Sequence, residues 1–171
     1  TEPYVDHLLS KHGFKQVAKQ YFKDDHSIFY AYVKDSSIET IELPGGLYKH
    51  NKKLYLDYVD YHKKLIIDLN EKIEKVDVDQ SIYLFGAHVF AQYLIEFGLD
   101  TSHIVCLLDN DINKQGKRLY GTDMMVESPK VLADVNNPIV ILKAGVYNNE
   151  IKQDILDNIN SKVFFLGLND D

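Results

Sequence analysis

The sequence has few of the residues that cross-link a chain or mark a metal site. Cys106 is the only cysteine among 171 residues, which excludes a disulfide framework or a cysteine-based zinc site within them. It lies inside the apolar run IVCLL, which favours a small core residue over a nucleophile. The dispersed histidines have no HxxxH or HExxH spacing, so no metal site is expected from His7, His12, His50, His62 and His103.

Long hydrophobic runs and an excess of basic charge are also lacking. The longest apolar runs are far shorter than the roughly 20 residues of a membrane span, and the opening TEPYVDHLL has no signal-peptide apolar region. The net charge of -7 and the pI of about 5.4 argue against non-specific binding of nucleic acid, which requires a basic surface. We therefore expect a cytoplasmic protein that binds neither membranes nor nucleic acids.

The second half of the chain alternates short apolar runs with amphipathic segments. Strands are expected at 82–85, 104–108, 124–126, 139–142 and 163–166, and helices at 88–97, 130–135 and 150–159. Such an order requires a parallel sheet wrapped by helices with right-handed crossovers. The predicted fold class is α/β, with a Rossmann-like parallel sheet flanked by helices, preceded by a long helix and a β-hairpin.

The first half contains simpler elements. Val5, Leu8 and Leu9 share one face of a short helix that Gly13 closes, and two strands at 14–22 and 27–34 form a hairpin around the turn 23–26. A proline-glycine turn then precedes one amphipathic helix over 47–76. We predict three parts, namely a helix and hairpin too small to bury a core alone, a linking helix and a Rossmann-like domain, over residues 1–45, 46–80 and 81–171.

The glycine turn after the first strand of the Rossmann-like part is a near match to the dinucleotide fingerprint GxGxxG/A. Gly86-Ala87-His88-Val89-Phe90-Ala91 places His88 where the second glycine would let the backbone meet a pyrophosphate. Ordinary NAD binding is therefore not expected, although a helix N-terminus still favours an anion. The alternative is a plain turn in which His88 is the first residue of the helix.

Other polar side chains follow the next strands. Asp109 stands where a carboxylate commonly meets ribose hydroxyls, or else Asp109 and Asn110 cap their own turn through Asx hydrogen bonds. Lys114 belongs to a basic loop that would suit a diphosphate, or is solvated. Tyr147 would stack on a base or bond to a sugar, or is partly buried. The candidate contacts for a nucleotide or sugar are Gly86, Ala87, His88, Asp109, Asn110, Lys114 and Tyr147.

The segments FGAH, LLDNDxxKQGKRLYGT, SPK and GVYNNEIKxxI occur in this order from Phe85 onward. Together they resemble the C-terminal domain of sugar C-methyltransferases, over about residues 47–165. The segment HGFKQVAKQYFKDDHSIFYAYVK resembles the end of the class I S-adenosylmethionine-dependent methyltransferase domain that precedes it in that family.

The resemblance implies a transferase with three parts, namely a zinc domain, an S-adenosylmethionine-binding domain and this C-terminal domain. Its substrate would be a nucleotide-linked keto-sugar, and its partner the upstream methyltransferase domain. S-adenosylmethionine and zinc are expected in the full-length enzyme only, because the cofactor loop and zinc cysteines are absent from these residues. The fragment is expected to contain no catalytic residue, and the candidate contacts become contacts to a nucleotide sugar.

Two alternatives stay open. One is a structural or dimerising module without a ligand, in which the long helix and Tyr55, Tyr58 and Tyr61 form the interface of a homodimer. The other is a nucleotide-sugar-binding half-Rossmann domain attached to another sugar transferase.

Overall fold

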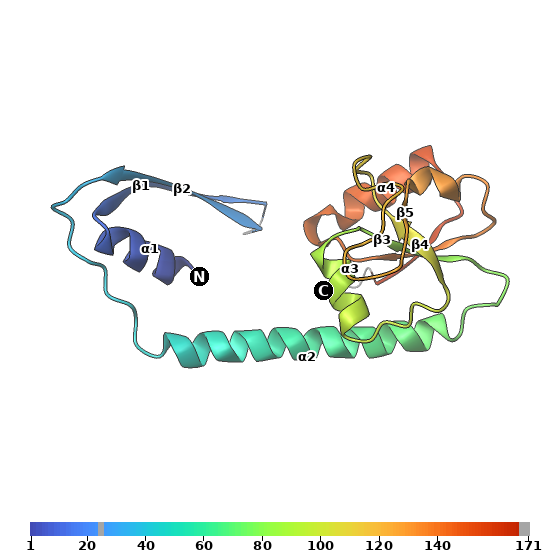
Figure 1. Ribbon diagram of the computed structural model, residues 1–171, viewed down its shortest axis with the longest axis horizontal. Helices are drawn as coiled ribbons and strands as arrows, with labels where there is room; N and C mark the ends of the chain where they lie inside the picture. The colour runs from blue at the N-terminus through green and yellow to red at the C-terminus, as the bar shows by residue number, and fades with distance from the viewer. Residues whose placement is uncertain (24–25, 168–171) are drawn as a thin grey trace. The chain divides into compact units, whose positions relative to one another are not determined.

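The computed structural model describes residues 1–23 and 26–167. They form two compact units, Thr1–Asp57 and Tyr58–Asp171, and the division falls within the helix α2 (Leu47–Ile73). Both units are shown in Figure 1. Among the described helices, none combines the length and the apolar character that a membrane crossing requires.

The first unit contains the predicted helix and hairpin. Helix α1 (Glu2–Lys11) is followed by Gly13, whose φ of +70° suits a glycine at a helix end. Strands β1 (Phe14–Phe22) and β2 (Ser27–Lys34) pair antiparallel as predicted, with a register shift between Gln16 and Ala18. The expected turn at 23–26 includes residues 24–25, which lie outside the described part of the chain.

Polar contacts hold α1 to the rest of this unit. The Tyr32 hydroxyl donates to the Asp6 carboxylate at 2.9 Å, which joins β2 to α1. The buried Ser10 hydroxyl accepts a hydrogen bond from the Ile41 backbone N–H at 2.9 Å. Ile41 belongs to the segment 35–46 after the hairpin, which contains neither helix nor strand. The hydrogen bond to Ser10 therefore holds this segment to α1.

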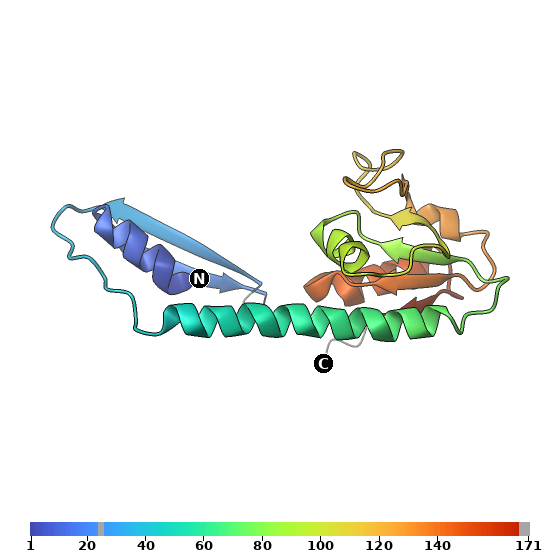
Figure 2. The same ribbon diagram turned by 60° about the horizontal axis from the view of Figure 1, so that its bottom comes forward.

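The second unit is built on a five-stranded parallel sheet in the order β5-β4-β3-β6-β7. This confirms the predicted α/β class with a Rossmann-like sheet, which Figure 2 shows from a second direction. Its strands are β3 (Ile82–Phe85), β4 (Ile104–Leu108), β5 (Val126–Glu127), β6 (Ile139–Leu142) and β7 (Phe164–Leu166). Its further helices are α3 (Val89–Glu96), α4 (Asn148–Asn158) and the 3₁₀ helices η1 (Pro129–Leu132) and η2 (Gly145–Tyr147).

Helices cover both faces of this sheet. Ile82 and Leu84 belong to the core that also contains Leu69 of α2 and Leu94 of α3. Alternate strand residues, among them Tyr83, Phe85 and Leu108, belong to the opposite core together with Leu132 and Ile155. Because successive strand residues point to opposite faces, a strand covered on both sides must be apolar throughout, which explains the run IYLF.

Three predicted elements differ from the observed ones. The segment 130–135 was expected to be an α-helix but contains the 3₁₀ helix η1, although Ser128 caps it as predicted by accepting from the Lys130 N–H. The Asn160 amide donates to the carbonyls of Leu132 and Val135, which ties this segment to the turn after α4. The short edge strand lies at Val126–Glu127, and α2 ends at Ile73.

Candidate functional site

Four chain segments meet at one edge of the parallel sheet. Residues 86–88 follow β3, 109–115 follow β4, 128–130 follow β5 and 143–147 follow β6. Because all these strands are parallel, their carboxyl ends form a common edge. The chain passes from β3 to its neighbour β4 on one side, and from β6 to its neighbour β7 on the other side. The topological switch point therefore lies between β3 and β6.

The turn after β3 depends on Gly86. Its φ is +101°, and its N–H donates to the Leu108 carbonyl at 2.7 Å. A Cβ atom at this position would lie 2.3 Å from Nε2 of His88, because the imidazole packs directly over the glycine. Both the backbone conformation and the space therefore require glycine here.

His88 is the N-cap of α3. Its Nδ1 accepts a hydrogen bond from the Phe90 N–H at 3.2 Å, and its ring meets the Phe90 ring edge to face at 5.5 Å between centroids. An accepting Nδ1 places the proton of the neutral imidazole on Nε2. Burial lowers the pKa of His88, the Lys114 ammonium lowers it further, and the Asp109 carboxylate opposes them. The neutral ring is thus the form that suits the cap.

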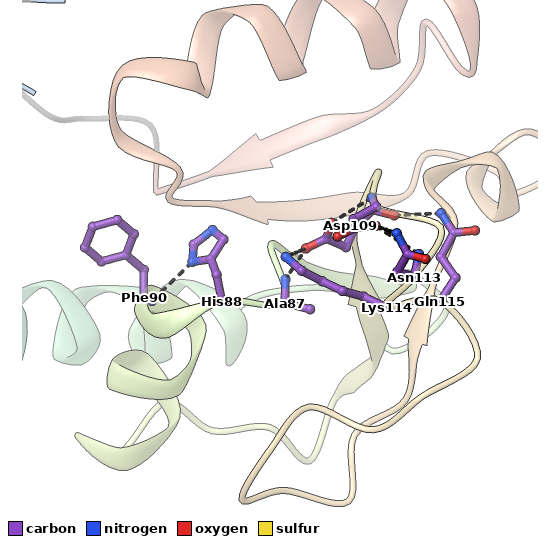
Figure 3. A network of polar contacts seen from close by, with 8 residues as sticks. Ala87, His88, Phe90, Asp109, Asn113, Lys114 and Gln115 are labelled. Atoms are coloured by element: carbon purple, nitrogen blue, oxygen red, sulfur yellow. Dashed lines mark hydrogen bonds and ion pairs between the residues drawn. The ribbon is translucent and has the colours of Figure 1, made fainter. Parts of the chain in front are cut away.

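Asp109 joins the turn after β3 to the loop after β4, as Figure 3 shows. Its side chain is buried, and Oδ2 accepts from the Ala87 N–H at 2.8 Å and from the Lys114 ammonium at 2.9 Å. Oδ1 accepts from the Asp111 N–H at 2.9 Å, which is the Asx turn considered as the alternative for this residue. The Gln115 amide donates to the Asp109 carbonyl at 2.9 Å.

These contacts use the donors that an anionic ligand would meet at the turn. The Ala87 N–H is bound by Asp109, and the Phe90 N–H is bound by His88. Lys114 is paired with the same Asp109 carboxylate. The protein's own carboxylate therefore lies where a phosphate would approach the Ala87 amide. We refer to Gly86, Ala87, His88, Asp109 and Lys114 as the carboxylate cluster.

The other two candidate residues lie elsewhere on the same edge. Asn110 is exposed and lines a groove beside η1 and α4. Tyr147 ends η2 after β6 and is 38% exposed. The structure thus brings the carboxylate cluster into direct contact and places Asn110 and Tyr147 at the ends of β4 and β6.

The groove beside η1 and α4 encloses about 600 Å³. Binding sites for small molecules typically enclose roughly 300–1,000 Å³, so this volume suits a ligand of nucleotide size. We call it the η1–α4 groove, and its lining includes Asn110, Ile112, Gln115, Pro129, Ala133 and Asn158.

A further group of aromatic and basic side chains lies beside β6, outside the candidate residues of the sequence analysis. The Lys143 ammonium lies 5.3 Å from the centre of the Tyr61 ring and 3.4 Å from its hydroxyl. His62 is buried between the rings of Tyr58 and Tyr61, and its Nδ1 lies 2.9 Å from the Tyr58 carbonyl. Burial raises the pKa of the Tyr58 hydroxyl. The position of Lys143 directly after a buried strand was the only available signal for this group.

Cys106 and the acidic and histidine side chains are the remaining groups that could carry chemistry. Cys106 is buried, as predicted, and burial raises the pKa of its thiol to about 11. A thiol with that pKa is not a nucleophile near neutral pH. Within residues 1–23 and 26–167, no three side chains of His, Cys, Asp or Glu gather as a metal site would need.

Comparison with known proteins adds no relative: no family model matches the chain, and no curated protein matches its sequence.

Proposed function

We propose that the chain is the C-terminal part of an S-adenosylmethionine-dependent C-methyltransferase that acts on a nucleotide-linked keto-sugar in the cytoplasm. One observation supports this proposal above all, namely where the segments that resemble the C-methyltransferases lie in the fold. FGAH and LLDND span the carboxyl ends of β3 and β4, and SPK and GVYNNE follow β5 and β6, at the sheet edge where open α/β folds bind their ligands.

The role proposed for this domain is to help hold the sugar nucleotide or to close the active site over it. In the complete enzyme, S-adenosylmethionine would supply the methyl group. A base outside this chain would remove the proton from the sugar carbon next to the carbonyl. That carbon would form the new bond to the methyl carbon as the bond from the methyl group to the sulfonium sulfur breaks, and the cofactor would leave as a neutral thioether. The domain itself contributes binding and orientation, which lower the entropic part of the barrier.

Calorimetric titration of the 171-residue chain with uridine-, thymidine- and guanosine-diphosphate glucose tests the binding role. One of these probes is expected to bind with a micromolar to millimolar dissociation constant. Asn110→Ala should weaken that binding several-fold because Asn110 stands at the carboxyl edge and lines the groove. Asn136→Ala is the matched control, since this exposed asparagine precedes β6 at the opposite edge. No heat with any probe at millimolar concentration would reject the binding role.

A second candidate function is a structural or dimerising module. The exposed tyrosines of α2 favour it, because Tyr55 is 66% exposed and Tyr58 and Tyr61 remain 41% and 44% exposed. Analytical ultracentrifugation separates the two proposals. A dimer that Tyr55→Lys dissociates, together with no ligand binding, would support the module.

A third candidate is a nucleotide-sugar-binding half-Rossmann domain of another sugar transferase. The internal pairing of the carboxylate cluster does not distinguish it from the first proposal, because either domain would bind at the same edge. The coding sequence upstream of Thr1 distinguishes them. A zinc-type cysteine cluster followed by a methyltransferase glycine loop supports the C-methyltransferase, and an unrelated catalytic domain contradicts it.

A further inference from the structure

The η1–α4 groove begins at the carboxyl edge, beside the loop after β4, and runs past η1 to the C-terminal end of α4, on one side of the carboxylate cluster. Asn110 and Ile112 reach it from the loop after β4, Pro129 and Ala133 from the segment after β5, and Asn158 from α4. In the cluster, the Ala87 N–H and the Lys114 ammonium are bonded to Asp109, whereas the groove is open space of about 600 Å³. A ligand at this edge therefore finds room beside the cluster.

The groove combines apolar surface with amide side chains. Ile112 is 78% exposed, and the exposed Ala133 extends the apolar surface. Asn110 and Asn158 each carry an amide, which both donates and accepts hydrogen bonds. An apolar surface bordered by amides suits a flat heterocycle whose edge carries donors and acceptors.

The charges of the groove favour the same kind of ligand. Its lining contains Lys130 and Asp154, one charge of each sign, so the groove as a whole does not select a polyanion. Asp154 already accepts a hydrogen bond from the Asn158 amide at 2.8 Å. Lys130 is exposed at the start of η1 and is the only cation in this lining, so a phosphate would lie beside it.

From these contacts we infer that the η1–α4 groove holds the nucleoside end of the sugar nucleotide, with the base against Ile112 and Ala133 and the diphosphate leaving beside Lys130. The inference rests on the proposed function and assigns the nucleoside to the groove rather than to the glycine turn. It follows that recognition depends on the base and ribose more than on the diphosphate.

Calorimetry with the 171-residue chain tests the assignment with uridine, thymidine and guanosine diphosphates and with inorganic pyrophosphate. One of the nucleoside diphosphates should bind at least tenfold more tightly than pyrophosphate. Ala133→Trp, which fills the groove from an exposed position, should weaken that binding at least tenfold. Val131→Trp is the matched control, since Val131 is exposed on η1 outside the lining, and it should change affinity less than twofold.

Lys130→Met provides a second variant that removes only a charge from an exposed side chain. It should weaken the nucleoside diphosphate about threefold to tenfold and leave the free nucleoside unchanged. Equal affinity for pyrophosphate, or unchanged binding by Ala133→Trp, would overturn the groove assignment while nucleotide-sugar binding survives. Wild-type protein that binds neither nucleotide sugars nor nucleoside diphosphates would overturn the proposed binding role as well.

Discussion

The carboxylate cluster and the η1–α4 groove lie at the same sheet edge but use their polar groups in opposite ways. In the cluster, the buried Asp109 carboxylate accepts three hydrogen bonds from the chain itself. In the groove, Asn110 and Asn158 border about 600 Å³ of open space. The residues most similar to a dinucleotide fingerprint thus build the sheet edge, while residues outside the fingerprint leave room for a ligand.

The largest effect is expected from Asp109→Ala. Removal of this buried carboxylate leaves the N–H groups of Ala87 and Asp111 without their acceptor, and it leaves the Lys114 ammonium without the carboxylate that pairs with it. The free energy of unfolding should fall by about 2–4 kcal/mol, measured by urea denaturation. Asp111→Ala is the matched control, because Asp111 makes the same kind of Asx turn to Asn113 but is exposed. An equal loss in both variants would contradict the special role of Asp109.

Gly86→Ala should have the next largest effect. The φ of +101° and the 2.3 Å approach of a Cβ to Nε2 of His88 both disfavour alanine, so we expect a loss of about 2–3 kcal/mol. In a His88→Ala background the steric part disappears and the loss should be smaller. A double-mutant cycle measures this coupling, and a loss that is the same in both backgrounds would show that the imidazole does not pack over the glycine.

His88→Ala alone should cost about 1 kcal/mol at pH 7–8, because it removes the N-cap of α3. The pKa of His88 is lowered in the folded state, so the unfolded state binds more protons and stability rises with pH through this transition. The cost of the substitution should therefore shrink as the pH falls below about 6.5. Urea denaturation at pH 5 to 8 measures the difference between wild type and variant, and a difference that grows toward pH 5 would contradict it.

The smallest effect on stability is expected in the groove. Ala133 is exposed and its backbone is helical, so Ala133→Trp should change the free energy of unfolding by less than about 0.5 kcal/mol. The same urea series measures it. A large loss would mean that Ala133 belongs to the packed structure, which would remove the contrast with the carboxylate cluster.

Much of the fold was predictable because burial of apolar side chains determines which residues form the strands. The run IYLF is apolar throughout since cores lie on both sides of β3, and Asp109 marks the end of β4 because a charge cannot continue a buried strand. The 3₁₀ form of η1 was not predictable, since Ser128 and Pro129 would begin either kind of helix, and the contact of this segment with Asn160, 28 positions from Leu132, had no local signal.

The site was predictable only in part. Patterns place Asp109 and His88 at the edge, but they do not say whether each side chain meets a ligand or the backbone of its own chain. Which of the two each side chain meets depends on the N–H groups within its reach. In the structure, Asp109 accepts from the Ala87 N–H and His88 accepts from the Phe90 N–H. The contact of Lys143 with Tyr61 spans 82 positions and had no local signal.

Amide chemical-shift mapping by NMR is the most direct test of the central claim that this sheet edge binds a sugar nucleotide in the groove. The chain would be titrated with the nucleotide-linked glucose that binds most tightly by calorimetry. The largest shifts are expected at residues 110–115, 128–133 and 154–159, and smaller ones at 86–90, where the Ala87 and Phe90 amides stay bonded to the protein. Shifts confined to α2, or none at saturating ligand, would contradict it.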